Sequence, residues 1–429
     1  MPRLYLMNCK DCKIAISTLG CKVNSYESAS IIQSFEGCEI VDFSEDADIY
    51  IINTCTVTNR SDYKSRNLIR KALKKKELNP AVKIVVTGCF AQRSATEIAE
   101  MGDIDYIIDN QAKLDIAQIL SGQEYCFTDI MQAKDFAFQP LSSMLDHTRA
   151  FQKIQDGCDF YCSYCAIPYG RGHSRSARFE DVISQAKLFA KQGYKEIVLG
   201  GINIGLYRDQ DKDLAAVVKA MAEIPSLELI RISSIEPQLI SFELIHKLRQ
   251  IDKLCPHFHI ALQSGSDAVL QAMGRNYDTA LVREMVEELL ALYPDAAIGF
   301  DVICGFPGET EAMFEQTLDF LSSLPICYLH VFSFSKRKGT PADTMPNQVN
   351  GKVKTQRAKE LTALSLAKKK DYARLLKQQN PLIRGVVELT GNGISESLSD
   401  HYLRVQLPQE LAIGSLICVP ADRVDFDLS

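Results

Sequence analysis

The amino-acid sequence predicts an α/β protein with three successive domains. Short apolar runs alternate with polar, helix-like stretches up to about residue 335, a pattern typical of parallel sheets covered by helices. Towards the C-terminus, short alternating runs separated by Gly, Asn and Pro are typical of antiparallel strands. The 429 residues, 46% of them hydrophobic, are enough to bury a core in each domain. We expect the domains to span residues 1–140, 141–375 and 376–429.

The first domain is expected to be doubly wound, with helices on both faces of a parallel sheet. Its apolar runs are short and continuous, as in strands that are buried on both faces. The predicted strands span residues 14–19, 48–53 and 83–87, and the predicted helices span residues 25–36, 61–76 and 94–101.

A cysteine follows each of these strands within two residues: Cys21, Cys55 and Cys89. Because parallel strands end at the same edge of a sheet, the three thiols are expected to converge. No fourth Cys or His accompanies them, and the first His of the chain is His147, so the set favours an iron–sulfur cluster with one open iron over a closed zinc site. Free Cys is often simply buried, which is the alternative for any one of the three.

Six more strands are predicted in the second domain, which fits an incomplete (β/α)6 barrel of the TIM type, open on one side. The first strand leads into Cys158, Cys162 and Cys165, spaced C-x3-C-x2-C. Three thiolates can ligate three corners of a four-iron cluster and leave the fourth iron open, whereas structural zinc requires four protein ligands. The six strands are expected at residues 151–155, 196–199, 229–233, 257–262, 298–303 and 328–334.

Residues suited to ligand binding follow other strands of this barrel, at the end where such barrels have their active sites. Gly200 and Gly201 would let the backbone approach a ligand closely. Ser234 and Gln263 offer neutral hydrogen bonds that suit ribose and amino-acid groups. Each of these positions taken alone is also compatible with an ordinary loop.

The third domain is predicted to be a small antiparallel β-barrel. It is acidic, with three Arg against seven Asp and Glu between residues 380 and 429. Residues 60–76 and 352–377 are strongly basic instead, with eight and nine Lys or Arg against one and two acidic residues. In a chain of net charge −6, these two stretches are the candidates for contact with RNA phosphates, unless their side chains are merely solvated.

The sequence favours a cytoplasmic protein. Six charged residues among the first 30 leave no apolar core for a signal peptide, and no stretch of about 18 apolar residues follows. We therefore expect no membrane contact. In that reducing compartment the 14 Cys would ligate metal or remain buried thiols rather than form disulfides.

The cysteine run of the second domain resembles the signature of the radical S-adenosylmethionine (SAM) superfamily, in which an aromatic residue, here Tyr164, precedes the last Cys. The order of the domains and the motifs at residues 19–28, 53–58, 168–176 and 235–237 resemble the methylthiotransferases, whose last domain is a TRAM domain. The resemblance covers nearly the whole chain and implies SAM and two [4Fe-4S] clusters as cofactors.

The resemblance also implies which residues hold these cofactors. One set of cysteines would ligate an auxiliary cluster and the other a cluster that chelates SAM through its open iron. The auxiliary ligands would be Cys21, Cys55 and Cys89, the SAM-cluster ligands Cys158, Cys162 and Cys165, and the SAM contacts Tyr164, Gly200, Gly201, Ser234 and Gln263.

The implied reaction consumes two SAM molecules. One donates a methyl group to a sulfur on the auxiliary cluster. The other is cleaved, with an electron from a flavodoxin- or ferredoxin-type donor, to a radical that activates C2 of an adenine. Lys22 and Val23 resemble the branch that acts on N6-threonylcarbamoyladenosine at position 37, in the anticodon loop of tRNA. The alternatives are a methylthiotransferase for isopentenyladenosine tRNA or a ribosomal protein Asp, and an iron–sulfur RNA-binding protein without catalysis.

Overall fold

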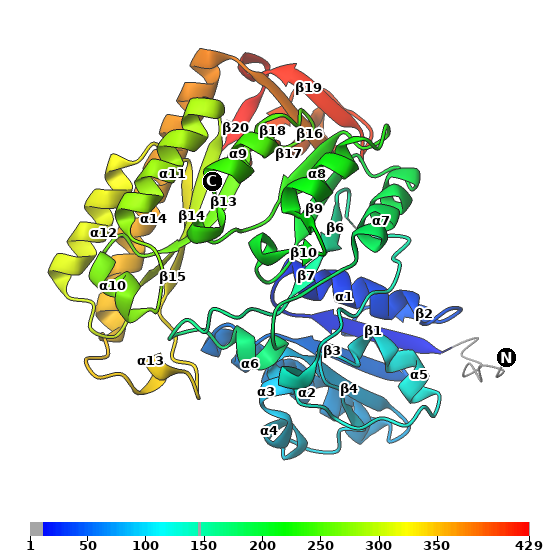
Figure 1. Ribbon diagram of the computed structural model, residues 1–429. Coiled ribbons are helices and arrows are strands. Elements are labelled where there is room, and N and C mark those ends of the chain that lie inside the picture. The colour runs from blue at the N-terminus through cyan, green and yellow to red at the C-terminus, as the bar shows by residue number, and fades with distance from the viewer. Residues whose placement is uncertain (1–11, 145–146, 429) are drawn as a thin grey trace.

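The computed structural model describes residues 12–144 and 147–428, which form a mixed α/β structure built on three groups of strands. A parallel sheet of N-terminal residues lies at one end of the central strands, and an antiparallel sheet of C-terminal residues lies at the other end (Figure 1). Within the described ranges, no helix is both long and apolar enough to cross a membrane.

The N-terminal sheet has five parallel strands in the order β2-β1-β3-β4-β5. Helices cover both of its faces, because Ile69 of α2 and Ile31 of α1 belong to hydrophobic clusters on opposite sides of the sheet. This is the doubly wound arrangement that the sequence predicts. The strands are β1 (Lys13–Thr18), β2 (Glu39–Val41), β3 (Ile49–Thr54), β4 (Lys83–Gly88) and β5 (Tyr106–Ile107), and the helices are α1 (Lys22–Gln33), α2 (Asn59–Leu78), α3 (Cys89–Arg93), α4 (Ala95–Ala99) and α5 (Ile116–Leu120).

Two features of this sheet differ from the sequence prediction. The edge strands β2 and β5 were not expected, because segments of three and two residues are too short to show a periodic pattern. The helix predicted at residues 94–101 is instead a pair of short helices, α3 and α4, so a helix begins directly at Cys89.

The central strands form two three-stranded parallel sheets, in the orders β12-β9-β6 and β13-β14-β15. Ile235 connects the sheets, since its N–H donates to the His259 carbonyl at 2.9 Å and its carbonyl accepts from Ala261 N at 3.0 Å. All six strands predicted for this region are present. They are β6 (Ala150–Lys153), β9 (Glu196–Gly200), β12 (Leu229–Ile232), β13 (His257–Gln263), β14 (Ala297–Cys304) and β15 (Tyr328–Ser333).

Most of the helices in this region pack against the six strands and share one hydrophobic core with them, whereas α13 belongs to a smaller cluster and α6 contributes to neither. The register of the strands places alternate side chains of β13, β14 and β15 on the opposite, inner face, where Asp301 pairs with His330. The helices are α6 (Ile167–Arg171), α7 (Phe179–Lys191), α8 (Leu214–Ala222), α9 (Phe242–Arg249), α10 (Asp267–Ala272), α11 (Thr279–Leu292), α12 (Glu311–Ser323) and α13 (Pro341–Thr344), and the short strand pairs are β7 (Gln155–Asp156) with β8 (Arg175–Ser176) and β10 (Arg208–Asp209) with β11 (Lys212–Asp213).

The long basic helix α14 (Gly351–Gln379) leads into a five-stranded antiparallel sheet in the order β19-β16-β17-β18-β20. The antiparallel strands agree with the sequence prediction. This sheet is fastened to the central strands by Arg231, which donates to the Ser399 carbonyl at 2.9 Å, and by Tyr402, which stacks on His257 at 4.1 Å between ring centres. The strands are β16 (Leu382–Gly391), β17 (Ile394–Ser399), β18 (Arg404–Leu407), β19 (Leu416–Pro420) and β20 (Asp425–Asp427).

The end of β4 requires a glycine, which gives a test of the fold. Gly88 has φ of 95°, and a Cβ there would lie 2.4 Å from the Thr54 carbonyl oxygen. Gly37 has a similar φ of 82° but nothing within 4 Å of such a Cβ. We expect Gly88→Ala to lower the free energy of unfolding by about 2 to 3 kcal/mol more than Gly37→Ala, as measured by urea denaturation. Equal losses would show that β3 and β4 do not meet this closely.

Candidate functional site

The three N-terminal cysteines come together at one edge of the parallel sheet. Thr54 and Gly88 are paired at the ends of β3 and β4, so Cys55 and Cys89 follow at the same level. Gly20 lies against Cys55, because a Cβ on Gly20 would be 2.8 Å from the Cys55 sulfur. Cys21 follows directly and caps α1. The convergence expected from the ends of parallel strands is therefore present.

Cys89 is held by polar side chains from outside its own sheet. The Nε of Arg171 donates to the Cys89 sulfur at 3.1 Å, and Asn110 Nδ2 lies 3.9 Å from the same atom. Contacts of this kind orient a sulfur that ligates a metal. Arg171 belongs to the 168–176 motif noted in the sequence, but its contact with Cys89 spans 82 residues and leaves no local signal.

The second cysteine triplet occupies the loop between β7 and α6. Each sulfur has a nearby donor: Asn203 Nδ2 at 3.7 Å from Cys158, Arg275 Nη1 at 3.0 Å from Cys162, and the N–H of Ile167 at 3.4 Å from Cys165. Burial raises the pKa of Cys165 to about 12, so the thiol holds its proton until a metal replaces it. Three thiols with three donors and no fourth protein thiolate in the loop fit an iron–sulfur cluster with an open corner.

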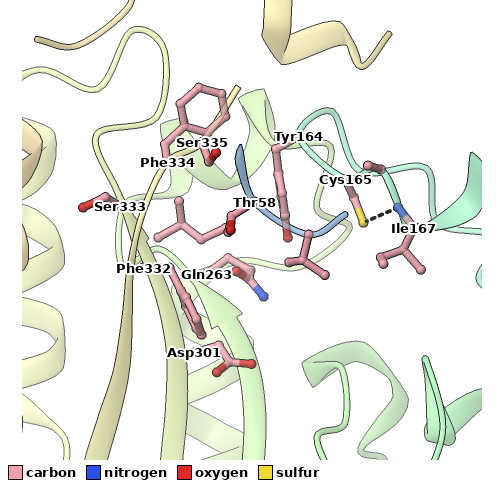
Figure 2. Close-up of a pocket in the computed structure, with 13 residues that line it drawn as sticks. Thr58, Tyr164, Cys165, Ile167, Gln263, Asp301, Phe332, Ser333, Phe334 and Ser335 are labelled. Carbon is pink, nitrogen blue, oxygen red and sulfur yellow. Dashed lines mark hydrogen bonds between the residues drawn. The ribbon is translucent and has the colours of Figure 1, made fainter. Parts of the chain in front are cut away.

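A pocket of about 230 Å³ lies beside Cys165 and reaches the N-terminal domain. Figure 2 shows Tyr164, Cys165, Gln263 and Asp301 around this space, with Thr58 beside Tyr164. Thr58 follows Cys55 by three residues, so the pocket extends from Cys165 of the second triplet to the loop that follows Cys55 of the first.

The N-terminal domain is fastened to the wall of this pocket. Arg337 donates to Thr56 Oγ1 at 2.8 Å and pairs with Asp62, and the N–H of Asn59 donates to Ser335 Oγ at 3.0 Å. These contacts hold the loop after Cys55 against the segment that follows β15.

Only two of the five residues predicted to contact SAM line this pocket. Tyr164 and Gln263 line the pocket, and Gln263 has a positive φ of 72° at an irregularity of β13. Gly201 packs against the side chain of Gln155 instead, since a Cβ there would lie 3.0 Å from Gln155 Cβ. Gly200 and Ser234 are half-buried near the ends of β9 and β12, outside the lining of this pocket.

The floor of the pocket carries a polar group that the sequence did not reveal. Asp301 accepts a hydrogen bond from His259 Nε2 at 2.9 Å, and His330 Nδ1 lies 3.5 Å from the same oxygen. Burial opposes ionisation of Asp301, but the two imidazoles outweigh it and lower its pKa to about 2. His257 and His259 both contact the Tyr328 hydroxyl at 2.8 Å, which agrees with the structural role that alternating histidines on a strand suggest.

A buried ionic network connects the two cysteine sites. Glu27 of α1 accepts from Lys113 Nζ at 2.6 Å, from Lys153 Nζ at 2.7 Å and from Arg171 Nη2 at 3.0 Å. Burial alone would raise the pKa of Glu27, but Arg171, Lys113 and Lys153 hold it well below its usual value. Because Arg171 also contacts Cys89 and Asp156, the network fixes the N-terminal sheet against the cysteine loop.

The fold and this site define a class of protein. Radical SAM enzymes have a parallel α/β domain in which a loop near the first strand carries three cysteines. A family model described as the radical SAM superfamily matches residues 153–321. A second, described as an uncharacterized protein family, UPF0004, matches residues 13–109. A solved structure of the radical SAM methyltransferase TsrM from Kitasatospora setae has the same fold, with a TM-score of 0.57 and 12% identity over 78% of this chain and 75% of that chain.

Two curated relatives define the family more closely. Threonylcarbamoyladenosine tRNA methylthiotransferase MtaB from Bacillus subtilis (strain 168) is 42% identical over 376 residues, which are 84% of this chain and 82% of the relative. The protein of the same name from Aquifex aeolicus (strain VF5) is 33% identical over 420 residues, 95% of this chain and 99% of the relative. The chain belongs to the methylthiotransferase family of radical SAM enzymes, in the branch of these MtaB relatives, and its cofactors are SAM and iron–sulfur clusters.

Glu27 provides a test of the ionic network. Glu27→Gln leaves three buried cations short of a carboxylate, so we expect it to lower the free energy of unfolding by about 3 to 5 kcal/mol. Glu36→Gln, on the exposed end of the same segment, should change it by less than about 0.5 kcal/mol.

The stabilisation by Glu27 is expected to decrease as the pH falls. The folded-state pKa of Glu27 is depressed, so its stabilisation is complete above the unfolded value of about 4.3 and is lost as the pH falls through the folded value. Urea titrations should therefore show a smaller difference between wild type and Glu27→Gln in acid than at neutral pH. A difference that is small and independent of pH would contradict the network.

Proposed function

We propose that this protein, with two [4Fe-4S] clusters as cofactors, converts N6-threonylcarbamoyladenosine at position 37 of tRNA to its 2-methylthio derivative and uses two SAM molecules per turnover. The observation that carries the proposal is a contact between the two cysteine regions: Arg171, which follows the second triplet, donates to Cys89 of the first, and one pocket is lined by Cys165 and by Thr58 of the loop after Cys55. A reaction that joins sulfur to a radical-activated base needs both centres within reach of one substrate. The names of the MtaB relatives support this nucleoside as the substrate.

The chain's own residues would hold the cofactors as follows. Arg171 orients the thiolate of Cys89, and Arg275 and Asn203 orient those of Cys162 and Cys158. The clusters would supply an electron to SAM and a sulfur atom for the new bond. Tyr164 and Gln263 would line the SAM and base site. The ligand sets are Cys21, Cys55 and Cys89 for the auxiliary cluster and Cys158, Cys162 and Cys165 for the SAM cluster.

We propose three domains, residues 1–140, 141–375 and 376–429, with the six central strands as an incomplete barrel and the last domain as a TRAM-like barrel. The contacts of Arg231 and Tyr402 indicate that the last domain braces the central strands, which suits its acidic character. The protein would act in the cytoplasm with a flavodoxin- or ferredoxin-type electron donor.

An anticodon loop would present its base without the full cost of opening a duplex. Of the two basic helices, α2 is the better candidate for its phosphates. Three of its eight cations, Arg66, Lys75 and Lys76, pair with carboxylates of this chain, which leaves five for RNA. Helix α14 uses at least five of its nine cations internally. Arg357 and Arg374 pair with carboxylates, and the amines of three lysines donate to backbone carbonyls: Lys354, Lys368 and Lys377.

Replacing the auxiliary ligands separates the two halves of this chemistry. In the variant with Cys21, Cys55 and Cys89 all changed to Ala, we expect about half of the wild-type iron after anaerobic reconstitution. The variant should still release 5′-deoxyadenosine from SAM but form no methylthiolated nucleoside on a threonylcarbamoyladenosine stem-loop. Cys418→Ala, an exposed thiol of the C-terminal sheet, is the control and should match wild type. Unchanged iron in the triple variant would refute the second cluster.

A further inference from the structure

Lys22 is a cation without a counterion in the space between α1 and the central strands. It follows Cys21, and its side chain is accessible to solvent although protein surrounds it. Its Nζ lies 5.2 Å from the centre of the Phe151 ring on β6. In the described part of the chain, no carboxylate oxygen lies within ion-pair distance of this ammonium group.

Glu196, the carboxylate whose charge acts on Lys22, is already paired with other cations. Glu196 accepts from Arg231 Nε at 2.8 Å and lies 3.7 Å from Arg149 Nη1, and Glu388 pairs with Arg149 at 2.7 Å. Arg149 and Arg231 thus each have a carboxylate partner, whereas Lys22 has none within ion-pair distance in the described part of the chain. An enclosed charge without a partner is unfavourable unless an anion arrives to pair with it.

The inner face of the central strands continues from Lys22 towards the pocket. The charge of Lys22 acts on His257 of β13. His259 lies two residues further on the same face and contacts Asp301 on the pocket floor. An apolar substituent beside Lys22 would leave its ammonium group without a partner, whereas an anionic one would pair with it.

We propose that Lys22 binds the carboxylate of the threonylcarbamoyl group and so selects this nucleoside over one with an uncharged N6 substituent. This role rests on the proposed function, whose substrate carries that carboxylate. An ion pair with a partly enclosed ammonium group also explains why the cation is placed directly beside a cluster ligand: the N6 substituent and the base must reach their sites together.

The test compares two RNAs on the cluster-loaded full chain. One is a synthetic anticodon stem-loop with N6-threonylcarbamoyladenosine at position 37, and the other is the same RNA with the threonyl carboxylate as its methyl ester. We expect wild type to bind the acid at least about tenfold more tightly than the ester, measured as Kd by anaerobic fluorescence anisotropy. Lys22→Gln should remove this preference, and Lys22→Arg should retain it.

Lys187→Gln, which removes an exposed lysine from α7, is the matched control and should keep the wild-type preference. Equal binding of the acid and the ester by wild type would overturn the role of Lys22, and this comparison needs no variant to load its clusters. A tenfold preference that survives in Lys22→Gln would overturn it too. If wild type leaves the acid RNA unmodified, the proposed function fails as well; if it modifies that RNA but binds both equally, only the role of Lys22 fails.

Discussion

The structure depends on one buried carboxylate and the three cations around it. Glu27 joins α1 to Lys113, to Lys153 on β6 and to Arg171 on α6, and all four side chains are withdrawn from solvent. Buried charges tolerate little displacement, because any of them left unpaired is strongly destabilising. The N-terminal sheet is thereby held in one position over the loop of the second triplet. Arg171 carries that constraint to Cys89, so the geometry of one cysteine triplet is tied to the geometry of the other.

Contacts elsewhere in the molecule also hold the N-terminal and C-terminal sheets against the central strands. Arg337 fastens the loop after Cys55 to the segment after β15, and Arg231 and Tyr402 fasten the C-terminal sheet to the opposite end of the central strands. The pocket beside Cys165 is consequently bounded by the loop after Cys55 and by the central strands, which these contacts hold together. Such a pocket suits a reaction in which a radical centre and a sulfur source must reach one base without the radical reaching solvent.

Much of this could be predicted from the sequence, for identifiable reasons. Continuous apolar runs gave the central strands of each sheet, and the common edge of parallel strands placed Cys55 beside Cys89. What the sequence could not give are partners distant along the chain: Arg275 reaches Cys162 across 113 residues, and no local pattern marks it. Charge counts also overstated the basic surface, because Lys76 and its neighbours on α2 proved to be partly paired. Gly201 shows the same limit, because a glycine can make room for a neighbouring side chain as well as for a ligand.

The central claim is that the two triplets serve a single reaction on a tRNA base. Mass spectrometry of tRNA nucleosides from cells that lack the gene tests it most directly. The account predicts loss of 2-methylthio-N6-threonylcarbamoyladenosine, accumulation of N6-threonylcarbamoyladenosine, and restoration by the wild-type gene but not by one without the auxiliary cysteines. A nucleoside profile unchanged by the deletion would contradict it.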